Sequence, residues 1–121
     1  MQVKFSYLYR DAGNYKAWGE VVFGNPENIP LDELDARLRK AFEVDGLFVA
    51  HQVSIPEVFL YLNGELTDDD HCYHEFFSLE LTDEKPNDHL ERSIKQFVVQ
   101  VEEESNLGWA AFHPAERIAN Q

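Results

Sequence analysis

The sequence predicts an α+β fold: a two-layer sandwich in which an antiparallel sheet of about four or five strands carries two helices on one face. Two observations predict it. Segments that alternate apolar and polar residues come in pairs joined by turn residues, and a segment with apolar residues at helical spacing follows each pair. The halves at about residues 1–46 and 57–104 share this order of strand, strand, helix. Two such ββα units would merge their strands into one sheet.

The first half supplies two strands and a helix. Residues 3–10 and 18–23 alternate in hydrophobicity, which is typical of half-buried strands, and the turn residues between them favour a hairpin. Pro26 ends the second strand because proline cannot donate to a ladder. Residues 30–42 are predicted to form a helix, since apolar side chains recur there at three- and four-residue steps: Leu31, Leu34, Leu38, Ala41 and Phe42.

The second half is expected to repeat this order. The segments expected to be extended are residues 47–55, which Pro56 ends, and the two strands at 58–62 and 71–81. Asp88 and Glu91 have the spacing of a capping box, so a helix is expected to start there and to run to about Glu104. Residues 113–121 are expected to form a loose tail.

Length and composition indicate one globular domain over residues 1–121. The chain is 44% hydrophobic and 13% aromatic, which is enough for a core. The single cysteine, Cys72, excludes an intramolecular disulfide and favours a reducing, cytoplasmic compartment. The first residues do not resemble a signal peptide, and no run of about 18 apolar residues predicts a membrane span.

The net charge of −13 is unevenly placed. Residues 1–40 hold six basic and six acidic side chains, whereas residues 41–121 hold four basic and seventeen acidic ones. Such a field repels phosphates and anionic lipids, so neither direct nucleic-acid binding nor membrane binding is expected. The sequence therefore favours a small acidic protein-binding domain, of the inhibitor, antitoxin or adaptor type, that engages a basic partner surface. Solubility is the plainer explanation of the same charge.

Eight carboxylates are the expected partner-binding residues. Three of them stand together at the expected end of the last helix, where they oppose the helix dipole at roughly 0.3–1 kcal/mol each at low salt. Locally unfavourable choices of this kind are places to look for function. A helix that ended before these three acids would leave them simply solvated. The eight residues are Asp68, Asp69, Asp70, Asp83, Glu84, Glu102, Glu103 and Glu104.

The alternative is a small metal-dependent enzyme that uses zinc or iron. A catalytic zinc needs three protein ligands, and histidine, cysteine and carboxylate side chains are suitable. In a strand, Cys72 and His74 would lie on one face and His71 and Glu75 on the other, so these four meet at one ion only with a bulge. His51 is a further candidate ligand. Because no established zinc spacing is present, the main expectation is a protein without a cofactor.

The sequence gives less support to several other functions. The acids next to Cys72 would raise the pKa of its thiol and so oppose its use as a nucleophile. The acids at 68–70 are more typical of a solvated loop than of a paired-carboxylate hydrolase. Aromatic side chains with bases on a sheet can stack nucleic-acid bases, which the overall charge opposes. A homodimer formed by pairing sheet edges is an open alternative.

Overall fold

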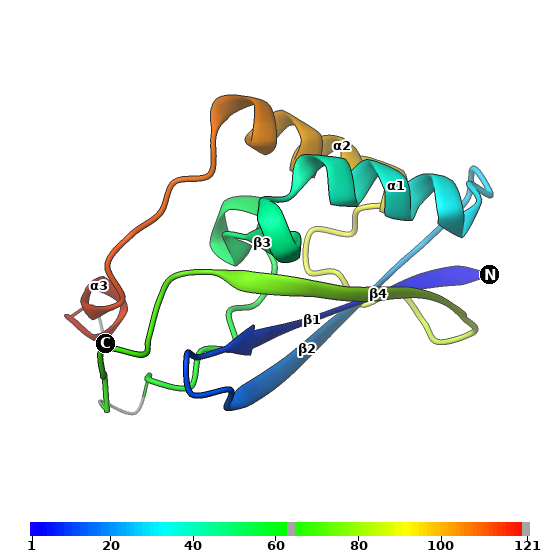
Figure 1. The fold of residues 1–121 in the computed structure, drawn as a ribbon. Helices are drawn as coiled ribbons and strands as arrows, with labels where there is room; N and C mark the ends of the chain where they lie inside the picture. Colours follow the sequence, from blue (N-terminus) through cyan, green and yellow to red (C-terminus); the bar gives the residue numbers. More distant parts are fainter. Residues whose placement is uncertain (63–64, 120–121) are drawn as a thin grey trace.

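The computed structural model describes residues 1–62 and 65–119 and has an α+β fold (Figure 1). The strands are β1 (Gln2–Arg10), β2 (Lys16–Phe23), β3 (Leu47–Phe48) and β4 (His74–Thr82). The helices are α1 (Leu31–Ala41), α2 (Ile94–Leu107) and the short α3 (Ala115–Ala119), with 3₁₀ turns at Val44–Gly46 and Ala50–Val53. The strands form one curled antiparallel sheet in the order β2-β1-β4-β3, which confirms the α+β class and the antiparallel sheet of the prediction.

Strand β1 is central in the sheet and carries much of the core. It pairs antiparallel with β2 and β4, so its side chains alternate between the two faces. Val3, Phe5 and Tyr7 are buried in the layer that the sheet shares with the helices. Phe5 stacks on Phe76 of β4 and meets Phe97 of α2 edge-on. One ring therefore joins the central strand to its neighbour and to a helix.

Helices α1 and α2 pack against each other and lie side by side over the sheet (Figure 1). Leu34 and Leu38 of α1 and Phe97 and Val101 of α2 are fully buried in the same core cluster as the side chains of β1. The spacing of these residues places each pair on one face of its helix, which is the face that the sequence pattern predicts.

Helix α2 begins later than the sequence predicts. The expected capping box at Asp88 and Glu91 is wrong, because Glu91 has a φ of 55° and the Asp88 carboxylate binds Arg92 instead. The box that forms is made by Ser93 and Gln96. The Ser93 hydroxyl accepts the N–H of Gln96, and the Gln96 side chain accepts the N–H of Ser93.

The end of the chain also differs from expectation. Helix α2 continues to Leu107, so the acids at 102–104 lie inside the helix instead of at its end. Residues 115–119 form α3 and are not a loose tail. Residues 120 and 121 of that expected tail lie outside the described residues.

Residues 47–62 do not form the extended segment and strand that their alternation predicts. Only Leu47–Phe48 pairs with the sheet, as β3, and Ala50–Val53 is a 3₁₀ turn. Residues 58–62 join no ladder, and the N–H of Val58 donates instead to the imidazole of His74. Of the predicted second ββα unit, the described chain therefore has β4 and α2 but not the strand at 58–62.

A small aromatic cluster explains why residues 58–62 alternate. Phe59 and Tyr61 pack against Tyr9 of β1, with ring centroids between 4.7 and 5.7 Å apart. Phe112, from the segment before α3, packs against the same rings. The apolar residues of this segment are therefore buried by side-chain contact and not by strand pairing.

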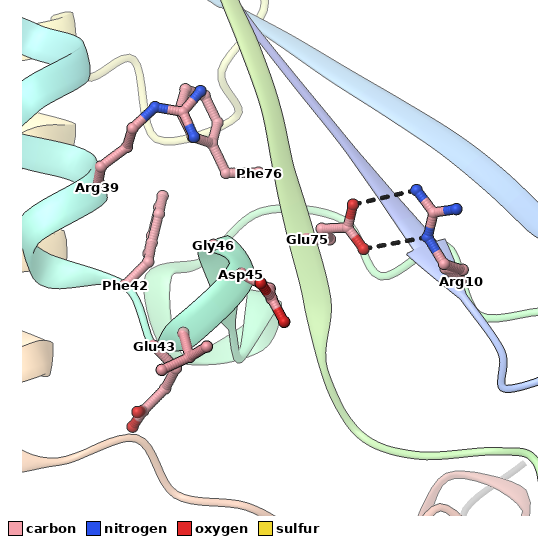
Figure 2. A pocket seen from close by; sticks show the side chains of 9 residues that line it. Arg10, Arg39, Phe42, Glu43, Asp45, Gly46, Glu75 and Phe76 are labelled. Atoms are coloured by element: carbon pink, nitrogen blue, oxygen red, sulfur yellow. Dashed lines mark hydrogen bonds and ion pairs between the residues drawn. The ribbon is translucent and has the colours of Figure 1, made fainter.

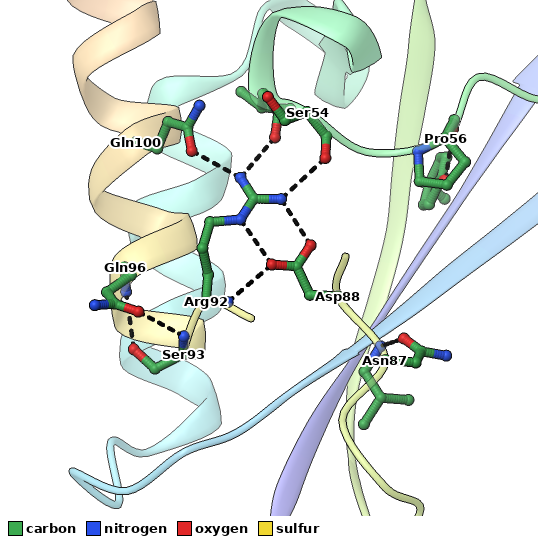
Figure 3. Close-up of polar contacts among 11 residues, drawn as sticks. Ser54, Pro56, Asn87, Asp88, Arg92, Ser93, Gln96 and Gln100 are labelled. Carbon is green, nitrogen blue, oxygen red and sulfur yellow. Dashed lines mark hydrogen bonds and ion pairs between the residues drawn. The ribbon is translucent and has the colours of Figure 1, made fainter. Parts of the chain in front are cut away.

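A buried arginine joins the start of α2 to the 3₁₀ turn at Ala50–Val53 (Figure 3). Arg92 donates to both carboxylate oxygens of Asp88 at 2.9 Å. It also donates to the carbonyls of Val53 and Ser54 at 2.7 and 3.0 Å, and to Oε1 of Gln100 at 2.7 Å. All five guanidinium N–H groups therefore have an acceptor. The side chains of Arg92 and Asp88 are only 9% and 1% exposed.

Candidate protein-binding surface

The outer side of β4 is an open part of the sheet. β3 pairs with only the first two residues of β4, His74 and Glu75. Gly46, at φ 76°, lies against the next residue, since a Cβ on it would be 3.5 Å from the carbonyl oxygen of Phe76. Beyond that point, no backbone group of the described residues pairs with the outer side of residues 77–82. We call this outer side the β4 edge.

Hydrogen bonds at the opposite edge of the sheet show whether a given β1 residue directs its backbone N–H and C=O toward β2 or toward β4. The N–H and C=O of Val22 in β2 are bonded to Asn87, on the side away from β1. Val22 opposes Lys4 of β1, so this pair exchanges no backbone hydrogen bonds. Bonded and non-bonded pairs alternate in an antiparallel ladder. The two residues that flank Lys4, Val3 and Phe5, are therefore bonded to β2.

The same alternation fixes which backbone groups lie on the β4 edge. Val3 and Phe5 turn their N–H and C=O toward β2 and hence away from β4. They oppose Leu81 and Leu79 of β4. Leu79 and Leu81 therefore turn their own N–H and C=O outward, and these groups have no backbone partner within the described chain. The Leu81 side chain is itself 53% exposed.

A groove of about 880 Å³ lies at the point where β3 leaves β4 (Figure 2). Arg39 of α1 lies over the ring of Phe76, with 4.7 Å between the guanidinium carbon and the ring centroid. Phe42 forms the end of the groove nearest the core. Glu43 and Asp45 line the groove and are exposed. The groove therefore combines aromatic side chains with carboxylates next to the β4 edge.

An exposed aromatic pair lies on the helix-free face beside the same edge. Phe77 is the extra residue of a β-bulge, because Ser6 opposes Ser78 while Tyr7 opposes Phe76. Its ring meets Trp18 of β2 edge-on at 5.0 Å between centroids, and the two residues are 55% and 54% exposed. Exposed aromatic side chains of this kind are typical of binding surfaces.

The eight carboxylates expected to bind a partner lie in three separate places. The acids at 68–70 lie against the tip of the first hairpin, where the N–H of Ala12 donates to the carbonyl of Asp69. The acids at 83 and 84 follow the far end of β4, whose nine residues span about 30 Å. The acids at 102–104 lie on α2. The structure does not bring the eight together.

Three of these eight acids already have a hydrogen-bond or ion-pair partner within the chain. Asp70 accepts a 2.6 Å hydrogen bond from the hydroxyl of a buried tyrosine. Glu84 pairs with Lys4 of β1. Glu102 pairs with Arg37 of α1 at 2.6 Å, and the hydrogen bond from Arg37 lowers the pKa of Glu102. The remaining five have no cation within 4.0 Å in the described part of the chain: Asp68, Asp69, Asp83, Glu103 and Glu104.

Acids outnumber the available cations across the described residues. Ion pairs occupy seven of the 23 acidic and six of the ten basic side chains, which leaves sixteen acids and four lysines without a partner within 4.0 Å. Glu43, Asp45 and Glu80, which sequence reasoning did not single out, are among the sixteen. They lie in the groove or on β4 itself.

The side chains of the metal-site alternative do not converge. No group of three or more His, Cys, Asp or Glu residues in the described ranges is placed to hold a metal ion. His51 is exposed, whereas Cys72 is buried. His71 bonds through Nε2 to the carbonyl of Arg10, and Glu75 accepts two bonds from the Arg10 guanidinium at 3.2 Å (Figure 2). No observation therefore favours a zinc or iron enzyme.

His74 is buried between the main core and the small aromatic cluster. Its Nε2 accepts the N–H of Val58 at 2.9 Å, which places the proton on Nδ1, an atom without a hydrogen-bond partner in the described residues. Burial lowers the pKa of His74 to about 3, so the ring is neutral. Burial also raises the pKa of the Cys72 thiol. Neither group has the exposure or charge that catalysis would need.

Comparisons of the chain with known protein families, curated proteins and solved structures found no match. Among the described residues, the longest helix is α2 with 14 residues, and none has the length and apolar character required to cross a bilayer. Function is therefore inferred from the geometry of this chain alone.

The β4 edge is a candidate surface that sequence reasoning missed. Its residues, Phe-Ser-Leu-Glu-Leu-Thr at 77–82, hold one charge and neither lysine nor proline. Edge strands usually carry such protective residues, so this composition favours a central strand. Only the brevity of β3 turns it into an open edge.

Proposed function

We propose that this protein is a small protein-binding domain, of the inhibitor, antitoxin or adaptor type, whose acidic C-terminal two-thirds engages a basic surface of its partner. The excess of sixteen unpaired acids over four unpaired lysines in the described chain carries the proposal. A field of this sign attracts a basic partner, speeds its association and suppresses binding to acidic surfaces.

The surroundings of the β4 edge support this region as the contact. Binding surfaces typically have an apolar centre with a polar rim. Phe77 and Leu81 supply exposed apolar side chains, Glu80 lies between them in β4, and Glu43 and Asp45 line the groove where the edge begins. The acids at 68–70 and 102–104 lie on other parts of the molecule, against the first hairpin and on α2, and add to the general field.

Affinity capture from the organism that encodes the protein, followed by titration of the captured protein, tests the proposal. The captured protein is expected to be basic. Its affinity is expected to fall steeply between about 0.1 M and about 1 M salt, where the Debye length shortens from about 10 to about 3 Å. An affinity that does not change with salt would contradict the proposal.

Matched charge variants locate the contact. Glu43→Gln with Asp45→Asn removes two charges beside the β4 edge, and Asp68→Asn with Asp69→Asn removes two at the hairpin tip. The first pair is expected to weaken partner binding several-fold more than the second, because only short-range pairs escape screening. Equal losses would place the contact elsewhere.

The cytoplasmic location and the homodimer alternative stay predictions. Sedimentation at several protein concentrations tests whether the homodimer forms.

A further inference from the structure

We propose that the partner docks by strand addition, with an extended basic segment pairing with the β4 edge in line with β3. This inference rests on the proposed function and specifies how the partner is held. Extended peptides add to open sheet edges through backbone hydrogen bonds, while alternate side chains give specificity. The outward N–H and C=O groups of Leu79 and Leu81, unpaired in the described chain, are the groups such a segment would meet.

Apart from the bulge at Phe77, the β4 edge lacks the features that normally prevent such pairing. Natural edge strands are short, or are protected by lysine, proline or a covering segment. The edge at 77–82 extends over about 20 Å and carries one charged side chain, Glu80. The other edge of the sheet is closed at Val22 by Asn87. Residues 16–20 of β2 also lack an outer backbone partner in the described chain, but this part of the edge carries the exposed Lys16, which would repel a basic segment, so β4 is the edge that fits such a segment.

The two faces of the edge define the pattern of the incoming segment. Leu79 and Leu81 lie on the helix side, because the β1 residues that they oppose are core residues. Glu80 and Phe77 lie on the helix-free face. Side chains that are cross-strand neighbours on one face interact. A segment that alternates apolar and basic residues therefore fits, with apolar side chains against the leucines and basic ones beside Glu80.

Charge decides between a basic segment and a second copy of the chain. Two copies would bring together two net charges of −13, which repel each other. A basic segment would meet Glu80 at the centre of the edge, Glu43 and Asp45 at one end and Asp83 at the other, none of which has a cation within 4.0 Å in the described residues. The two arginines that line the groove are each already bound to a carboxylate.

A synthetic peptide of about eight residues that alternates valine and lysine tests the inference, and a peptide that alternates valine and glutamate is its charge control. The lysine peptide is expected to bind at least about tenfold more tightly. It is also expected to shift the NMR signals of the Leu79 and Leu81 amides more than those of α2. Shifts confined to the helices would overturn the inference.

Two variants of one residue isolate the backbone contribution. Leu81→Pro removes an outward N–H at an exposed position and leaves the ladder to β1 intact, whereas Leu81→Ala removes the same side chain and keeps the N–H. Leu81→Pro is expected to bind the lysine peptide about five- to tenfold more weakly than Leu81→Ala, as expected for one lost hydrogen bond. Equal affinities would overturn the inference.

Glu80→Lys is a second test that leaves every backbone group in place. It is expected to reverse the preference between the lysine and glutamate peptides, and it decides the question if circular dichroism shows that Leu81→Pro is unfolded. An unchanged preference would overturn the inference.

The two proposals fail in different ways. A captured basic partner that binds in a salt-dependent manner, but binds Leu81→Pro and Leu81→Ala equally, would refute strand addition and leave the proposed function standing. Absence of salt-dependent binding to both the peptide and any captured protein would refute the function itself. Self-association that Leu81→Pro abolishes would replace the basic segment by a second copy and would overturn the inference.

Discussion

The guanidinium of Arg92 meets both carboxylate oxygens of Asp88 at 2.9 Å, and the pair is almost completely shielded from water. Burial alone would raise the pKa of Asp88, but the hydrogen bonds from Arg92 outweigh it and hold that pKa below its ordinary value. Asp88 is therefore ionised, and its charge depends on one partner.

Arg92→Met is expected to destabilise the fold by about 3–5 kcal/mol, because it leaves a buried carboxylate without its cation. Urea unfolding measures the loss. Arg39→Met, which breaks an exposed ion pair with Asp35 and removes the guanidinium from the ring of Phe76, is the control and is expected to cost less than about 2 kcal/mol. The double variant Asp88→Asn with Arg92→Met is expected to lose less than the sum of the single losses. Additive losses would show that the two residues act independently.

Stability is expected to fall in mild acid because of His74. Its folded pKa of about 3 lies below the unfolded value near 6.5, so the unfolded chain binds the extra proton between these values. The contribution of neutral His74 to the free energy of unfolding is complete above about pH 6.5 and decreases as the pH falls toward about 3. At about pH 5 the free energy of unfolding is lower by about 2 kcal/mol. Urea unfolding at several pH values measures it. His74→Phe should flatten this dependence, while His51→Gln, at an exposed histidine, should not.

Gly19→Ala is expected to destabilise the fold by about 1–3 kcal/mol through overpacking. A Cβ at this position would lie 2.6 Å from Cζ of Tyr7. That ring cannot move aside easily, because it is buried and its hydroxyl donates to the carbonyl of Pro56 at 2.6 Å. Gly24→Ala is the matched control, since its nearest neighbour would be 3.8 Å away. Equal melting temperatures for the two variants would contradict the packing argument.

The Cys72 thiol is expected to react slowly in the folded protein. Burial raises the pKa of the thiol and also blocks access, so little thiolate is available to a disulfide reagent. Labelling at about pH 8 is expected to be at least about tenfold slower than in the urea-unfolded chain. Rapid labelling of the native protein would instead indicate an accessible thiolate and would revive the nucleophile alternative.

Periodicity in the sequence correctly predicts the helices and strands that bury one regular face against the core. Strands β1 and β2 and helix α1 lie within one or two residues of the expected positions, because each buries one regular face against the core. Strand β4 was expected from residue 71 and begins at His74. Residues 58–62 show the limit of the approach, since the packing of Phe59 and Tyr61 against Tyr9 gives the same alternation as a ladder.

The candidate site could not be predicted in the same way. Whether a strand is central or at an edge depends on its neighbours in space, and β4 is open only because β3 ends after two residues. The charge excess was visible in the sequence. Its local pairing, such as Glu102 with Arg37, depends on how α1 and α2 pack. The sequence therefore predicts the sign of the charge on the proposed partner but does not predict the place of contact.

The small aromatic cluster is joined to the sheet mainly by side chains, through the rings of Phe59 and Tyr61 against Tyr9. Segments held in this way form separate cooperative units that open at lower free energy than a strand ladder. The described amides near Phe59 should therefore take up deuterium while β1 is still protected. The molecule would then undergo subglobal opening at this end, with the β4 edge preserved throughout.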